Sequence, residues 1–369
     1  MSPAADALPV RIEACDCLTP LGDAAATHAA LLAGTRALTL QPVLGGDGGD
    51  KAPLALCRPM TETVPPRWLP ELRRLAAGIP ADDWGTARRP VIVTSSNFGV
   101  GSLLAFTQDH DECHLRHGPP FACVDLLRRE FAWGEQVWLL SHACVSAQLG
   151  LAQAARLLHA ALAERVLVLT FDFLSPFVAG GFASLKILNA GWPAPYAARE
   201  SGSIGLGDGA AFAVLHRTRG DFRLEAHAWH NEMHHFTGNR ADGSGFAICA
   251  DAIAAAGGGR RVWIKGHGTG TLEAGRLEAE AFARALPGAP LVSWKGSLGH
   301  TLGSSGLVEL AITLAAVRAG RVPGTVGSAP PCFTDNVALD AFAAGGFDGV
   351  VLDSNAFGGA HAAMLLSHA

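Results

Sequence analysis

The sequence predicts an α/β protein, and the order of its apolar segments supports this. Short apolar runs end in turns, as buried strands do, and apolar helices follow several of them. Such alternation indicates a largely parallel sheet with helices on its faces. The expected strands include residues 89–96, 137–140, 166–170, 211–216, 262–265, 290–295 and 350–355.

Two segments of the chain are built alike, which suggests a duplication. One reads VWLL–SHACVSA–GLAQAARLL and the other LVSW–KGSLGHTLGSSG–LVELAITLAA. Each is a buried strand, a tight turn with a reactive side chain, and an apolar helix. We therefore expect two halves, residues 1–219 and 220–369, with Gly220 as the seam. Because ligands gather at the carboxyl ends of parallel strands, the turns after these strands are the expected site.

Composition bounds the class of protein. A chain of 369 residues is too long for one simple core, and 49% hydrophobic residues suffice for a large one. The net charge of −5 gives no general attraction to nucleic acid or an anionic membrane. There is no signal-peptide core at the N-terminus and no apolar run near the ~18 residues of a membrane span. We expect a soluble cytoplasmic protein whose residues 41–90 are rich in loops.

Eight cysteines are present, and their spacing fits neither a zinc site nor a disulfide framework. A small buried residue is the default interpretation of each. Cys144 differs because its turn lies between a buried strand and a helix expected to begin near Ser146. The free N–H groups and dipole of that helix end stabilise a thiolate, and the geometry resembles a nucleophile elbow. A structural role for Cys144 stays open at this point.

Two further Gly-rich turns carry candidate catalytic side chains. His267 lies in KGHGTGT, where small residues admit a substrate arm and Thr269 and Thr271 offer hydroxyls. In KGSLGHTLGSSG, Lys295 disfavours protonation of the nearby His300, and a neutral histidine can donate N–H to an oxyanion. Taken singly, these residues also fit a capping histidine, a surface lysine and a core histidine.

Two other segments were considered as binding elements. SNAFGGAH (354–361) ends a strand in a Gly-rich turn that can present a backbone N–H to an oxyanion, or be an ordinary turn. HAWHNEMHH (227–235) is rich in histidine but lacks an HExxH motif, so no metal site is expected.

Taken together, these motifs resemble those of the β-ketoacyl-acyl-carrier-protein synthases. ACVSA around Cys144, GHGTGT around His267, KGSLGHTLGSSG around His300 and the terminal SNAFGGAH follow one another in the order seen in that family. GLGDGAAFAVL and HHFTGNRADGSG also look like segments of it, and the resemblance runs from about residue 10 to the end.

The resemblance implies a thiolase-like fold, in which two α/β halves form a five-layered αβαβα sandwich, usually in a dimer. It implies that the N-terminal half carries the nucleophile and the C-terminal half both catalytic histidines. Cys144 is then the acyl acceptor, and His267 and His300 flank a malonyl thioester. The other implied roles are pocket support by Lys295 and Glu278, contact of Thr269 and Thr271 with the phosphopantetheine arm, an oxyanion hole from the N–H groups of Cys144 and Phe357, and an acyl-pocket gate at Phe357.

The implied reaction is a decarboxylative Claisen condensation in fatty-acid, polyketide or polyene biosynthesis. It needs acyl- and malonyl-loaded carrier protein but no metal or organic cofactor beyond the carrier's own arm. The second subunit is a second copy or a ketosynthase-like partner. The alternative is a non-catalytic subunit resembling a chain-length factor, and the presence of Cys144, His267 and His300 argues against it. Thiolases, a third possibility, pair the nucleophile with a second cysteine.

The chain departs from the family pattern at several positions. Gly275 replaces an Asp, Asn355 replaces the first aromatic residue of the terminal motif, and His142 replaces a Thr or Ser. The first half is also short between residues 40 and 135. These departures suggest a specialised synthase of the polyene or aryl-polyene type. Acyl chain length, starter unit and pathway are not readable from the sequence.

A basic docking patch for an acidic carrier protein is also expected near the pocket entrance. The candidates are two arginine pairs, Arg73 with Arg74 and Arg88 with Arg89, which also fit a solvated basic face.

Overall fold

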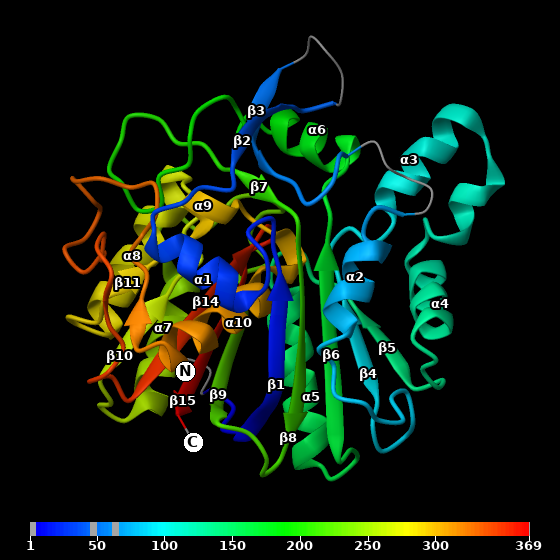
Figure 1. Cartoon of the computed structure of the whole chain (residues 1–369). Helices are drawn as coiled ribbons and strands as arrows, with labels where there is room; N and C mark the ends of the chain where they lie inside the picture. Colours follow the sequence, from blue (N-terminus) through cyan, green and yellow to red (C-terminus); the bar gives the residue numbers. More distant parts are fainter. Residues whose placement is uncertain (1–4, 45–49, 61–65, 369) are drawn as a thin grey trace.

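The computed structural model describes residues 5–44, 50–60 and 66–368, and a ten-stranded mixed sheet runs through it (Figure 1). The strands in sheet order are β11 (Leu291–Val292), β10 (Val262–Lys265), β14 (Gly349–Ala356), β15 (Ala360–His368), β9 (Phe222–Asn231), β1 (Val10–Leu18), β8 (Gly209–His216), β6 (Arg165–Asp172), β4 (Val91–Thr94) and β5 (Val137–Leu140).

The sheet consists of two sets of strands with the same internal order. β5, β4 and β6 are parallel and are followed by antiparallel β8 and β1. β11, β10 and β14 repeat this pattern and are followed by antiparallel β15 and β9. The sets join where β1 pairs with β9. This repetition agrees with the expected duplication, and Gly220 lies between β8 and β9 with φ +131°; a domain boundary at residue 220 stays a prediction.

Helices form three layers around these two sets. α5 (Ser146–His159) and α10 (Ser305–Arg318) contact each other and strands of both sets, so they form the central layer. α2 (Leu69–Ala76) and α4 (Pro120–Glu130) contact the first set. α7 (Ser244–Gly257) contacts the second set, and α8 (Leu272–Ala285) packs on α7. The order of the layers is therefore αβαβα.

The other elements are short and connect these layers. They are α1 (Ala24–Leu32), β2 (Thr39–Pro42), β3 (Lys51–Ala55), α3 (Val100–Asp109), η1 (Glu112–Arg116), α6 (Pro176–Ser184), β7 (Leu206–Gly207), α9 (Lys295–Leu298), η2 (Leu302–Ser304), β12 (Arg321–Val322) and β13 (Phe342–Ala343). None of the helices in the described part of the chain is both long and apolar enough to cross a membrane.

Three sequence expectations need correction. The sheet is mixed rather than largely parallel, because a short turn connects β14 to β15 and such hairpins give antiparallel strands. The strand expected at 290–295 ends at Val292, and Lys295 begins α9 instead. Residues 41–90 contain β2, β3 and α2 as well as loops, although residues 45–49 and 61–65 lie outside the described chain.

Candidate active site

Cys144 lies in the tight turn between β5 and α5, directly before the helix begins at Ser146. Ala143 takes a left-handed backbone conformation with φ +46°. The Ser146 hydroxyl donates to the Ala143 carbonyl at 2.6 Å and accepts the His142 N–H at 2.7 Å. The sequence thus placed Cys144 correctly at a helix N-terminus.

The Cys144 thiol is buried, and this changes the protonation state expected from the sequence. Burial raises the pKa of Cys144 to about 12, and the nearby Asp172 acts in the same direction. Lys295 and the backbone N–H groups of Cys144 and Phe357 lower that pKa, by less. The resting group is therefore a thiol rather than the expected thiolate. Both N–H groups assigned to the oxyanion hole act on this one sulfur.

His267 and His300 lie next to each other, with ring centroids 4.9 Å apart and an interplanar angle of 87°. Burial and the charge of Lys295 lower the pKa of both rings well below its ordinary value. Both imidazoles are therefore neutral, as the sequence predicted. Neither ring nitrogen of His300, nor Nδ1 of His267, has a hydrogen-bond partner among the described residues. These nitrogens are free to bond a ligand.

One pocket of about 330 Å³ brings the sequence-predicted residues together. Its lining includes Cys144, His267, His300, Thr269, Thr271 and Phe357. The Thr269 and Thr271 hydroxyl oxygens lie 3.1 Å apart, and the Phe357 ring stacks on Phe182 with centroids 5.8 Å apart.

Lys295 and Glu278 lie behind this lining. Lys295 is fully buried and its Nζ lies 2.6 Å from Oε1 of Glu309. Lys265 binds the other oxygen of Glu309 at 2.9 Å. Glu278 accepts the backbone N–H of His267, and that of Gly268 at 3.0 Å. Glu278 therefore holds the turn that carries His267, and the implied role of Lys295 and Glu278 in supporting the substrate pocket stays a prediction.

The sequence interpretation missed three buried charged residues of this region. Lys265 ends an apolar strand, and Glu309 is an isolated acid in an apolar helix. A charge within a buried apolar segment implies a buried partner, so this signal was present in the sequence. Asp172 accepts hydrogen bonds from Ser95 Oγ at 2.7 Å and from the N–H groups of Ser96 and Asn97; burial raises its pKa to about 6.

Asn355, which departs from the family pattern, is held in the pocket wall by two partners. Its amide donates to Oδ2 of Asp353 at 2.6 Å, and its Oδ1 lies 2.6 Å from Nδ1 of His361. The other nitrogen of His361 lies 2.8 Å from Oε1 of Glu232. Asn355 is therefore fixed as part of a buried polar chain.

The other two departures have simpler surroundings. The His142 ring packs edge to face on Trp229, with centroids 5.1 Å apart. Gly275 is buried in α8, where an added Cβ would lie 3.7 Å from the Phe333 ring and 3.9 Å from the Tyr196 ring. No group of three potential metal ligands occurs among the described residues.

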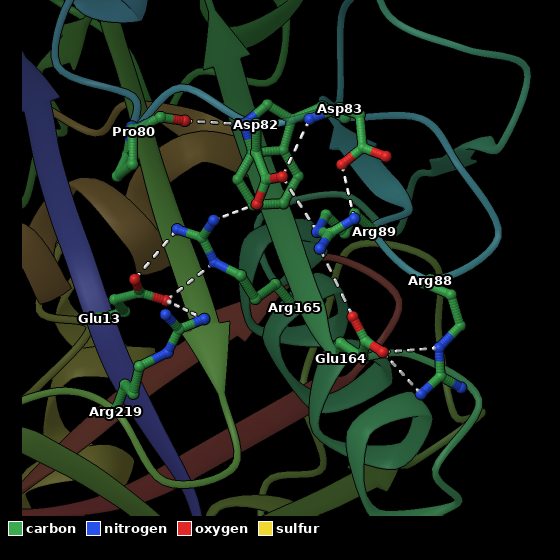
Figure 2. A network of polar contacts seen from close by, with 10 residues as sticks. Glu13, Pro80, Asp82, Asp83, Arg88, Arg89, Glu164, Arg165 and Arg219 are labelled. Carbon is green, nitrogen blue, oxygen red and sulfur yellow. Dashed lines mark hydrogen bonds and ion pairs between the residues drawn. The ribbon is translucent and has the colours of Figure 1, made fainter.

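The structure does not bring the proposed docking arginines to the pocket. Arg73 pairs with Glu130 at 2.6 Å, and Arg74 pairs with Glu71 at 2.8 Å. Figure 2 shows Arg88 and Arg89 in a network with acidic residues. These two arginines precede β4, at the edge of the sheet opposite the turn of Cys144. Carrier docking at either pair stays a prediction.

Known proteins with similar structures share this fold. A ketosynthase (ApeO) in complex with its chain length factor (ApeC) from Xenorhabdus doucetiae matches with a TM-score of 0.79 at 20% identity, over 98% of both chains. A complex named AntDE:AntF, a type II polyketide synthase acyl-carrier protein with its ketosynthase, matches with a TM-score of 0.84 at 17% identity, over 99% of this chain and 100% of that one. These matches define a thiolase-like fold and confirm the predicted fold class.

Sequence comparisons identify the proteins that this chain resembles. Residues 224–328 match the model of the β-ketoacyl synthase C-terminal domain. The ketoacyl synthase alpha subunit of the tetracenomycin polyketide synthase from Streptomyces glaucescens is 30% identical over 65% of this chain and 62% of its own length. The chain spans about half the length of the curated relatives it matches, 45% to 62% in three of them. The chain is therefore similar to type II ketosynthases over part of their length.

Proposed function

We propose that this protein is a 3-oxoacyl-acyl-carrier-protein synthase that uses Cys144 as its nucleophile. One observation carries the proposal: the Cys144 thiol, two backbone N–H groups directed at it and two neutral histidines occupy a single pocket. Covalent catalysis on a cysteine splits a difficult condensation into two easier steps. His267 and His300 then act only in the second step.

In the first step, the Cys144 sulfur attacks the carbonyl carbon of an acyl thioester. The N–H groups of Cys144 and Phe357 stabilise the resulting oxyanion. The carrier's thiolate leaves and takes up the proton that Cys144 releases. This exchange of one thiol for another suits a nucleophile that rests as a thiol.

In the second step, a malonyl thioester loses carbon dioxide and becomes an enolate. Neutral imidazoles of His267 and His300 donate N–H to its oxygen, and each has an unpartnered nitrogen among the described residues. The enolate carbon attacks the acyl carbonyl on Cys144, and the C–S bond breaks. The product is a 3-oxoacyl thioester, and the Cys144 thiolate takes up a proton from solvent.

The proposed partners are acyl- and malonyl-loaded carrier protein and a second ketosynthase-like subunit. The solved structures similar to this chain include complexes with a chain length factor and with a carrier protein. β5 ends the sheet, and its Leu139 is 37% exposed. An apolar edge strand with free backbone groups favours assembly through that edge, with a second copy or a partner. The cytoplasmic location expected from the sequence stays a prediction.

The test is to incubate the purified protein with acyl-carrier protein and map the adduct by mass spectrometry. We expect acyl groups on Cys144, loss of that adduct and of product in Cys144→Ala, and no loss in Cys332→Ala, which changes a partly exposed cysteine outside the pocket lining. No adduct with any acyl donor would refute the proposal. If Cys144→Ala leaves product formation by a purified complex intact, the protein is instead a non-catalytic subunit resembling a chain-length factor.

A further inference from the structure

The peptide group between Gly266 and His267 is bonded at both ends by charged side chains. The Lys265 ammonium donates to the Gly266 carbonyl oxygen, and the Glu278 carboxylate accepts the His267 N–H. Lys265 and Glu278 are 0% and 2% exposed. A cation at the oxygen and an anion at the N–H match the dipole of the peptide group, and charge-assisted hydrogen bonds are stronger than neutral ones.

Lys265 is itself held in place by other buried groups. Its Nζ lies 2.9 Å from Oε2 of Glu309 and 5.7 Å from the centroid of the Trp294 ring. Glu309 binds Lys295 through its other oxygen. The chain contains only four lysines, and two of them share this one glutamate. Burying a second lysine is costly, and an apolar residue of similar volume would serve stability as well.

Close packing limits movement of the same peptide group. A Cβ at Gly266 would lie 2.1 Å from the Tyr196 hydroxyl and 2.7 Å from Oε1 of Glu278. The group is therefore confined by packing on one side and by opposite charges at its two ends. Because a planar peptide group leaves few free torsions, holding it sets the direction from which the His267 side chain starts.

We propose that Lys265 is a positioning residue for His267: with Glu278, it fixes the Gly266–His267 peptide group and so the orientation of the imidazole in the pocket. This inference deepens the proposed function and rests on it. Lys265 lies outside the pocket lining, so it acts through His267 and not on substrate.

The charge of Lys265 also bears on the protonation of His267. Burial is the largest cause of the lowered pKa of His267, followed by the charge of Lys295, and the charge of Lys265 acts in the same direction. The ionisable groups that face Lys265 itself are Glu309 from α10, Lys295 from α9, Glu278 from α8, Asp353 from β14, and His267 and His300 on the pocket side. Removing a nearby positive charge makes the imidazolium less unfavourable, so a neutral residue at 265 raises the pKa of His267.

The experiment compares Lys265→Met and Lys265→Gln with Lys51→Met, which changes an exposed lysine on β3. We expect Lys265→Met to lower kcat for condensation about tenfold or more, while acylation of Cys144 and the KM for the carrier change less than about threefold. In NMR titrations with labelled histidine, the pKa of His267 should rise in both variants, because both remove the positive charge of Lys265. Lys265→Gln keeps a donor for the Gly266 carbonyl, so it should recover part of the kcat lost in Lys265→Met. The pKa of His267 should stay raised in Lys265→Gln, because glutamine carries no charge.

Two outcomes would overturn the inference. One is a folded Lys265→Met with kcat within about twofold of the parent. The other is a pKa of His267 in Lys265→Gln that equals the pKa in the parent protein. This measurement still tests the inference if Lys265→Met does not fold. If the parent protein forms no 3-oxoacyl product, the proposed function fails. The histidine titration still decides the role of Lys265, because it needs no turnover.

Discussion

The His267 and His300 rings meet edge to face with centroids 4.9 Å apart, although one follows strand β10 and the other follows helix α9. The contact places two neutral imidazoles, each with one N–H, in the pocket that contains Cys144. Burial keeps both rings neutral, and Lys295 adds to that effect. The pair can therefore donate two N–H groups to one developing negative charge.

Condensation should tolerate weakly acidic solution. Both histidines have a pKa well below the ordinary value of 6.5, so they stay neutral when the pH falls through 6.5. We expect kcat at about pH 5.5 to be within about twofold of kcat at pH 7.5, measured as release of carbon dioxide from malonyl-carrier protein. Circular dichroism at both pH values controls for unfolding. A loss of kcat with a midpoint near 6.5 would contradict this.

Alkylation of Cys144 should increase with pH without reaching a plateau near neutrality. The thiolate is the reactive form, and the pKa of about 12 leaves little thiolate at neutral pH. We expect the rate of alkylation by iodoacetamide to rise about tenfold per pH unit between about pH 6 and about pH 9. Mass spectrometry of the Cys144 peptide measures this rate. Saturation near pH 7 would show instead that the helix end outweighs burial.

Arg67 and Asp208 form a buried ion pair that joins the segment just before α2 to the residue between β7 and β8. The two side chains are bonded through both carboxylate oxygens, at 2.9 and 2.6 Å, and Asp208 also accepts the Leu174 N–H. Arg67→Met should lower the free energy of unfolding by about 3–5 kcal/mol, because it leaves a buried carboxylate unpaired. Urea unfolding measures this. In the same assay the exposed Arg88→Met is the control and should change little.

Gly303 is required by close packing under the Cys144 turn. An added Cβ would lie 2.8 Å from Oδ2 of Asp172 and from the Ser96 N–H, and 3.0 Å from the Ala143 carbonyl oxygen. Gly303→Ala should therefore lower unfolding free energy by about 1–3 kcal/mol and slow acylation of Cys144.

Gly345→Ala is the matched control for Gly303→Ala, since an added Cβ there meets nothing within 4 Å. Its stability and acylation rate should equal those of the parent. Equal effects of the two substitutions would argue against the close packing.

The two arginine pairs proposed as docking residues can be compared by their effect on KM for the carrier protein. Charge reversal at Arg73 and Arg74 should raise KM for the carrier protein more than it lowers kcat, because it weakens encounter and not chemistry. Reversal at Arg88, at the sheet edge opposite the pocket, is the comparison. An unchanged KM would rule out Arg73 and Arg74 as docking residues.

The sequence by itself determined most of the strand and helix segments and which turns line the pocket. Apolar runs such as 137–140 and 262–265 became β5 and β10 with the same ends, because short buried strands have a strong local signal. The strand-to-helix turn marked Cys144 and the Gly-rich turns marked His267 and His300, and all three line one pocket. These features depend on residues that are neighbours in the chain.

Only the tertiary structure decided how the buried charges are arranged. Lys265, Glu309 and Lys295 come from β10, α10 and α9, and their ion pairs form because the fold removes all three from water. The same burial makes Cys144 a thiol, although its place at the start of α5 had indicated a thiolate. Desolvation depends on everything packed around a group, and no local pattern in a sequence reports it.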